Sequence, residues 1–242
     1  MFTNLLLDEN LLEEIIFKIP SLNWLINVCN NGNEDVFKRN LKLLARKSHT
    51  PLSLGIVFCQ DERKNKYNID KIIALIKENS NISVIRFSLL NVYKKYFQGL
   101  KPFSDPVLEL CKKITEVNPS IIIASECFIN FCNFSATAIA EMLEKYQVQN
   151  LYTSDFCRPI LEVRPDKTVK YCHLVPDKFL TVKNYRDFSC SKECYDYLTK
   201  QLCEFMNKNN KLCDKNDNCN KAICTGPCPA ICEYIRREKE GL

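Results

Sequence analysis

Glycine and histidine are scarce in this chain. Of its 242 residues, 5 are glycine and 2 are histidine. Without a Gly-rich loop leading into a helix, the sequence offers no nucleotide site of the Walker or dinucleotide-binding type. Two histidines leave little room for a nucleophile–base pair, and neither His49 nor His173 lies in a recognisable catalytic motif. The sequence therefore contains no catalytic constellation of that kind.

The chain also lacks a long apolar run. No window approaches the roughly 20 apolar residues that are needed to span a bilayer. Residues 1–20, MFTNLLLDENLLEEIIFKIP, lack a basic start and carry acids through their apolar run, which is not typical of a signal peptide. We therefore expect a cytoplasmic protein without a membrane partner.

The charge is weakly positive and evenly spread. The formal net charge is +5, with Lys and Glu interleaved along the chain, and 46% of the residues are hydrophobic. That hydrophobic content is ordinary for a globular protein with a core. Because there is no basic stripe interleaved with aromatic residues, we expect no nucleic-acid partner.

Cysteine, in contrast, is abundant. The chain has 15 cysteines, and ten of them lie between residues 157 and 232. In a reducing cytoplasm they are expected to be thiols or metal ligands, not disulfides. The five that precede this stretch are best explained as small buried hydrophobic residues. These are Cys29, Cys59, Cys111, Cys127 and Cys132.

Between residues 22 and 151, apolar runs of strand length alternate with segments of helical period. Strands are expected at 22–28, 52–58, 82–90 and 119–125, with a short one at 148–152. The helices between them are expected to begin at Asn33, Asn68 and Ser104, which can act as N-caps, and at Ala136. This order predicts a parallel sheet with helical crossovers, in which ligands bind at the carboxyl ends of the strands.

The two ends of the chain differ from this alternating region. Residues 2–19 resemble the end of a strand, a turn and a helix, so we expect an open sheet edge to be covered by an N-terminal segment or by another chain. After residue 152 the pattern predicts a second domain, 153–242. It begins with a hairpin that turns at Pro165-Asp166-Lys167 and continues with a helix at 191–208.

The last cysteines, in residues 213–232, lie in polar loop sequence that offers no core for a thiol to join. Iron–sulfur clusters are held by cysteine thiolates, commonly four per cluster. Structural zinc sites usually contain closely spaced cysteine pairs and often a histidine, whereas this chain has no Cys-x-x-Cys. The pattern favours an iron–sulfur cluster, with zinc as the alternative. Cys190 and Cys194 flank a helix start and are further candidate ligands, and Cys203 lies nearby.

The order of strands and helices, followed by a Cys-rich extension, resembles the radical SAM enzymes with a SPASM or twitch C-terminal domain. In the SPASM pattern a cysteine pair brackets a hairpin, and a glycine stands five places before the second cysteine. Cys157 and Cys172 fit this spacing, although Lys167 takes the place of the glycine. Residues 224–230, CTGPCPA, are similar to the second half of the Cys run in the pattern.

Two parts of the Cys run depart from the SPASM pattern. Five residues separate Cys213 from Cys219 where two are usual, and Cys232 follows unusually closely. The resemblance therefore implies one [4Fe-4S] cluster, or two. The ligands that it implies are Cys157, Cys172, Cys213, Cys219, Cys224, Cys228 and Cys232.

The resemblance implies that residues 1–152 are the latter strands of a radical SAM (β/α) barrel and that residues 153–242 are an α+β SPASM/twitch-like extension. Asn27 and Arg86 fall near positions that face S-adenosylmethionine in such barrels. The Cys-x3-Cys-x2-Cys loop, which holds the SAM-cleaving cluster of the family, does not occur in this sequence. The chain is then a fragment or a degenerate relative, and we expect it to bind SAM only when the N-terminal part is supplied.

The function implied is that of the C-terminal portion of a maturase, in which auxiliary clusters take part in the oxidative modification of a peptide or protein substrate. The chain by itself is not expected to cleave SAM. Two alternatives belong to other classes. One is a non-catalytic iron–sulfur module for electron transfer or peptide binding, and the other is a zinc-stabilised interaction domain.

Overall fold

The structure is a computed structural model in which the chain forms two compact units, residues 1–153 and 154–242. Each unit is described by itself. The structure describes residues 2–28, 33–59, 61–89, 103–125, 134–151, 162–163, 166–170 and 183–209. None of the helices in these ranges is both long and apolar enough to cross a lipid bilayer.

The first unit contains a five-stranded sheet in which every neighbouring pair of strands is parallel. The strands follow one another across the sheet in the order in which they occur along the chain. This order has none of the reversal that marks the switch point of a doubly wound sheet. The strands are β1 (Phe2–Thr3), β2 (Trp24–Asn27), β3 (Leu52–Phe58), β4 (Ile82–Leu89) and β5 (Ile122–Ser125).

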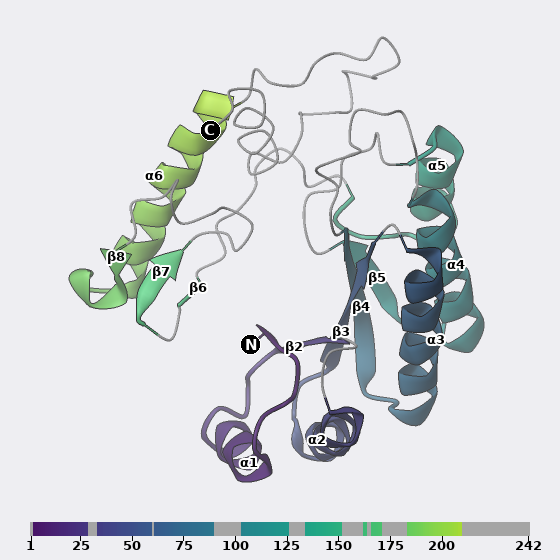
Figure 1. Ribbon diagram of the computed structural model, residues 1–242, viewed down its shortest axis with the longest axis horizontal. Coiled ribbons are helices and arrows are strands. Elements are labelled where there is room, and N and C mark those ends of the chain that lie inside the picture. Colours follow the sequence, from purple (N-terminus) through teal and green to yellow (C-terminus); the bar gives the residue numbers. More distant parts are fainter. Residues whose placement is uncertain are drawn as a thin grey trace. The chain divides into compact units, whose positions relative to one another are not determined.

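Five helices alternate with these strands, and each is in contact with the next. Ion pairs join the first four in sequence: Lys47–Glu13, Lys71–Glu34 and Lys113–Asp70. The Ser104 hydroxyl of the fourth accepts a hydrogen bond from the Ser135 N–H at the start of the fifth. Right-handed crossovers in a sequentially ordered sheet put all helices on one face, and Figure 1 shows α3, α4 and α5 on the same side of β3, β4 and β5. The helices are α1 (Glu9–Lys18), α2 (Glu34–Lys47), α3 (Glu62–Glu78), α4 (Ser104–Val117) and α5 (Ala136–Glu144).

The core lies between this helical layer and one face of the sheet. Alternate strand residues such as Ile26, Leu54 and Phe87 are fully buried and belong to the hydrophobic cluster that the helices complete. The residues between them, for example Leu25, Val57 and Val84, are half-buried and lie outside that cluster. Among the described residues, the sheet therefore has one face packed against helices and a second face that no helix of the first unit covers. We call this the second face.

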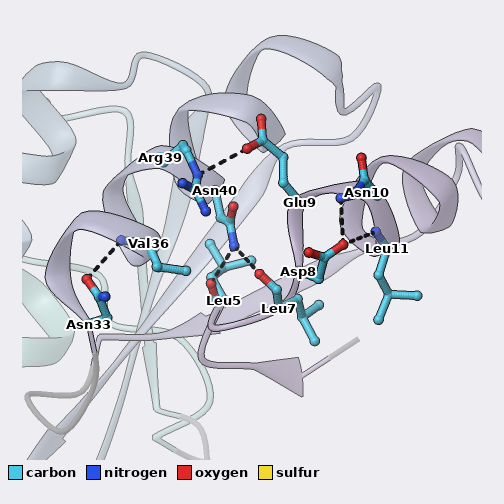
Figure 2. A network of polar contacts seen from close by, with 10 residues as sticks. All are labelled: Leu5, Leu7, Asp8, Glu9, Asn10, Leu11, Asn33, Val36, Arg39 and Asn40. Atoms are coloured by element: carbon cyan, nitrogen blue, oxygen red, sulfur yellow. Dashed lines mark hydrogen bonds and ion pairs between the residues drawn. The ribbon is translucent and has the colours of Figure 1, made fainter.

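The turn between β1 and α1 is held by a side chain from α2. Asn40 is fully buried, and its Nδ2 donates hydrogen bonds to the carbonyl oxygens of Leu5 at 2.9 Å and Leu7 at 2.8 Å. Leu5 has a φ of 56°, a left-handed conformation that β-carbon-bearing residues rarely adopt. Figure 2 shows Asn40 reaching between these two carbonyl groups. The amide thereby satisfies backbone acceptors that the strained turn would leave without partners.

The predicted elements are largely present, with three corrections. The helix expected to begin at Asn68 begins at Glu62, because the Asp61 side chain caps it by accepting from two backbone N–H groups. Asn68 is instead a buried residue inside α3. Ser104 lies within α4 and makes no cap hydrogen bond. In place of the short strand at 148–152, the described residues show only an isolated bridge between Ala124 and Gln149.

The second unit contains the expected hairpin and helix. The strands β6 (Glu162–Val163) and β7 (Thr168–Lys170) pair antiparallel, and β8 (Lys183–Asn184) pairs with β7 on its other edge. A short 3-10 helix, η4 (Tyr185–Asp187), leads to α6 (Ser191–Asn209). Cys194, Leu198 and Leu202 are buried on α6 at intervals of four residues, so this helix packs one apolar stripe.

Replacing Asn40 tests the importance of the β1–α1 turn. Asn40→Ala should lower the free energy of unfolding by about 2 kcal/mol, because the buried carbonyl of Leu5 and the part-buried carbonyl of Leu7 lose their partner. The control is Arg39→Ala on the same helix. Arg39 forms an exposed ion pair with Glu9, and its loss should lower the free energy of unfolding by about 0.5 kcal/mol. Urea unfolding followed by the fluorescence of Trp24 measures both, and equal losses would contradict the role assigned to Asn40.

Candidate functional site

The residues predicted to bind metal and cofactor fall into two groups. Asn27, Arg86, Cys190 and Cys194 lie in the described parts of the chain. The other predicted ligands lie outside the described residues, and so do Cys29, Cys127 and Cys132. Those ligands are Cys157, Cys172, Cys213, Cys219, Cys224, Cys228 and Cys232. Within the described ranges, no group of three or more His, Cys, Asp or Glu residues is arranged to hold a metal ion.

The structure brings Asn27 and Arg86 into one row of the sheet. Asn27 of β2 is in register with Gly55 of β3, Gly55 with Arg86 of β4, and Arg86 with Ala124 of β5. All four residues belong to the second face, because they alternate with strand residues that pack against the helices. We call Asn27, Gly55, Arg86 and Ala124 the polar row.

Both polar side chains of this row have a buried atom without a hydrogen-bond partner. The Asn27 Oδ1 atom is an acceptor, and the Arg86 Nε–H is a donor. A buried polar atom that leaves its hydrogen bond unmade costs about 1–3 kcal/mol. The Oδ1 atoms of Asn40, Asn68 and Asn81 are in the same state elsewhere in the first unit, so what distinguishes the row is that an acceptor and a donor of this kind lie in it together.

Gly55 determines where the Asn27 side chain lies. A β-carbon added to Gly55 would come 2.6 Å from Asn27 Oδ1 and 3.7 Å from a methyl group of Leu25. The amide of Asn27 therefore extends from β2 over β3. This is the direction of β4, which carries Arg86. Gly55 was not predicted from the sequence as a site residue, although a glycine inside a strand is a signal for a close approach of a neighbouring group.

The surroundings of Cys190 favour its thiolate form. It lies immediately before the first residue of α6 and is exposed. The backbone N–H groups of Glu193 and Lys192 hydrogen-bond to its sulfur and lower the pKa of the thiol. A thiolate at this place is a competent metal ligand and nucleophile.

Cys194 and Cys111 have the opposite environment. Cys194 is 4% exposed, and burial raises the pKa of its thiol, helped by the nearby charge of Glu193. Cys111 is fully buried in α4, and burial raises the pKa of its thiol to about 12. The prediction that Cys111 is a core residue is confirmed. Of the two candidate ligands at the start of α6, only Cys190 lies in surroundings that favour the thiolate form needed of a metal ligand.

Lys167 adopts the backbone conformation of a glycine. Its φ is 67°, in the left-handed region, at the turn between β6 and β7. The Asp166 side chain supports the turn by accepting hydrogen bonds from the Thr168 N–H at 2.9 Å and the Thr168 hydroxyl at 2.6 Å. A residue with a side chain in this left-handed region of φ lowers the free energy of unfolding by about 1 kcal/mol relative to glycine.

Comparison of the chain with known protein families, with curated proteins and with solved structures found no match.

Thiol alkylation tests the assignments of the described cysteines. In folded protein freed of metal, iodoacetamide at neutral pH should modify Cys190 faster than Cys203, because the N–H contacts of Cys190 favour the reactive thiolate. Cys203 is also exposed and serves as the reference thiol. Peptide mapping by mass spectrometry should find Cys111 and Cys194 unmodified until the protein is unfolded. Equal rates at Cys190 and Cys203 would contradict the effect assigned to the start of α6.

Replacing Lys167 by glycine should stabilise the second unit. Lys167→Gly removes the left-handed strain and should raise the free energy of unfolding by about 0.5 kcal/mol, the difference that remains after the extra chain entropy of glycine. Lys200→Gly is the matched control, because it introduces glycine at an exposed position inside α6 and should cost about 1 kcal/mol. Differential scanning calorimetry measures both, and a loss at both positions would contradict the strain at Lys167.

Proposed function

We propose that this chain is the C-terminal portion of a radical SAM/SPASM-type maturase. In this proposal residues 1–152 are the latter strands of a (β/α) barrel, and residues 153–242 hold one or two auxiliary [4Fe-4S] clusters. The substrate is a peptide or protein that undergoes oxidative modification. The segment with the SAM-cleaving cluster is supplied from outside the sequence, by an N-terminal segment or by a partner chain.

The sheet of the first unit supports the barrel assignment. Its strands are parallel, in sequential order, with contacting helices along one face. This is the arrangement from which a (β/α) barrel is built, and it leaves the second face as the barrel interior. The observation that carries the proposal is the polar row on that face, where a barrel enzyme would hold its ligand.

The hairpin of the second unit supports the SPASM assignment. The glycine of the SPASM pattern corresponds to Lys167, and Lys167 has the left-handed φ that favours glycine. The departure from the pattern is thus in residue type, while the backbone conformation is the one that glycine would adopt there. The turn keeps its geometry at a modest cost in stability.

S-adenosylmethionine fits the polar row in chemical terms. Its carboxylate would accept a hydrogen bond from Arg86 Nε, and Asn27 Oδ1 would accept from one of its N–H or O–H groups. Bound SAM would supply, on reductive cleavage by an iron–sulfur cluster outside this sequence, the radical that starts the reaction. The residues of this chain would bind and orient it on the second face.

The cysteines of the second unit would bind the auxiliary clusters. Cys190 fits as a thiolate ligand because the N–H groups at the start of α6 lower the pKa of its thiol. Cys194 does not fit in its buried state. The remaining ligands of this proposal are the seven cysteines implied by the SPASM resemblance.

Metal and sulfide analysis tests this function. Protein purified without oxygen should contain iron and acid-labile sulfide in equal amounts. Cys224→Ala and Cys228→Ala should each lower the iron content by half or more, since each removes a ligand. Cys111→Ala is the control and should leave the iron content unchanged, because this thiol lies in the core of the first unit. Stoichiometric zinc without sulfide would refute the cluster and favour a zinc-stabilised interaction domain.

A further inference from the structure

We propose that one side of α1 is an interface through which two copies of this chain form a symmetric dimer. The interface consists of Leu11, Ile15 and Ile19, and we call it the open flank. It lies at the end of the helical layer, where α1 has α2 on one side and none of the described helices of the first unit on the other (Figure 1). The inference does not rest on the proposed function, because it uses neither the clusters nor S-adenosylmethionine.

The two sides of α1 differ in chemistry. The side toward α2 carries Glu9 and Glu13, which form ion pairs with Arg39 and Lys47 of α2. Figure 2 shows Glu9 turned toward Arg39 and Leu11 turned away from it. The free side of a helix at the end of a layer is normally polar, so an apolar side at this place indicates that a further element packs against it.

The open flank is a row of three aliphatic residues at intervals of four. Leu11 is 45% exposed and Ile19 is 49% exposed, whereas Leu12 and Ile16 of the same helix are buried in the core. Ile15 is half-buried at the margin of the core cluster. The Ile19 N–H donates a hydrogen bond to the Ile15 carbonyl oxygen at 2.9 Å, so Ile19 continues the row beyond the last helical residue. The row is thus an apolar ridge whose two ends are exposed.

The charges beside this ridge favour a second copy of the same helix as its occupant. Glu14 and Lys18 lie along one margin of the ridge, where both are exposed and pair with each other. In an antiparallel pair of α1 helices with a two-fold axis near Ile15, Leu11 of each copy lies opposite Ile19 of the other. The same axis brings Glu14 of each copy beside Lys18 of the other. The open flank is therefore complementary to itself in shape and charge, as a symmetric interface requires.

The backbone at this edge of the sheet can take part in the same contact. β2 is the only strand that pairs with β1 in the described sheet, so the outer side of β1 carries N–H and C=O groups outside the ladder. Such an edge is a template for pairing with a second chain. The two-fold axis would bring the two β1 edges together in antiparallel direction, and the sheet would continue from one copy into the other.

Sedimentation equilibrium of the full chain tests the dimer. We expect the wild type to dimerise with a dissociation constant in the micromolar range. Leu11→Lys should weaken association at least about tenfold, because an ammonium group then meets Ile19 in both halves of the symmetric contact. Phe17→Ser is the matched control, since Phe17 is 86% exposed but follows Glu13 by four residues and so lies off the open flank. It should leave the dissociation constant unchanged, with circular dichroism confirming that both variants fold.

An exchange of charges tests the antiparallel arrangement. Lys18→Glu and Glu14→Lys should each weaken the dimer about fivefold at low salt, because like charges then meet at both ends of the helix pair. An equimolar mixture of the two variants should associate with the affinity of the wild type, because each carboxylate then meets an ammonium group of the other chain. A mere loss of helix stability in the single variants would not be reversed by mixing them.

Each outcome decides for or against the dimer. The proposal is overturned if Leu11→Lys associates like the wild type, if Phe17→Ser weakens association as much as Leu11→Lys, or if the mixture associates no better than its components. A wild type that is monomeric at about 100 μM also overturns it, and leaves this edge to the outside segment of the proposed barrel. Zinc in place of iron and sulfide, with the dimer intact, refutes the maturase and leaves the dimer standing.

Discussion

The first unit depends on burial against a single layer of helices. Alternate residues of β2 to β5 enter one hydrophobic cluster with α1 to α5, and the residues between them do not. Ion pairs join neighbouring helices at their polar edges. Lys71 shows this best: its side chain is 8% exposed, its Nζ lies 2.6 Å from Glu34 Oε2, and it sits 5.1 Å above the ring of Phe37. An ammonium group so nearly buried needs both partners. Because the helices of the first unit lie on one side, the other face can carry polar and small residues beside apolar ones such as Leu25 and Val84.

This one-sided packing explains why the polar row can exist. Arg86 or Asn27 on the helical face would have to enter a dry cluster of Leu, Ile and Phe side chains. On the second face the same residues are half-buried, although Asn27 Oδ1 and Arg86 Nε are themselves buried atoms without a hydrogen-bond partner. The unsatisfied atoms thus lie outside the hydrophobic cluster that the helices complete.

Cysteines in this chain differ in chemistry according to their place in the fold. Burial in α4 keeps Cys111 protonated, whereas the N–H groups at the start of α6 favour the thiolate of Cys190. Cys194, only four residues from Cys190, is turned into the apolar stripe of α6, and burial raises the pKa of its thiol. The number and spacing of the cysteines led to the prediction of metal binding, whereas the local electrostatics of the described cysteines determine which thiol favours the thiolate form.

The sequence by itself determined the alternation of elements in the first unit. Asn33 caps α2 as predicted, residues 52–58 form β3, and the hairpin turns at Asp166 and Lys167, because period, capping and turn chemistry are local properties. The start of α3 was missed because the charged segment after Asp61 carries no apolar period, although Asp61 is itself a good cap. Only the tertiary structure decided that Asn27, Gly55 and Arg86 share a row and that Asn27 lies over Gly55. Strand register arises from contacts between segments far apart in the chain, and a shift of one residue would have sent each of these side chains to the other face.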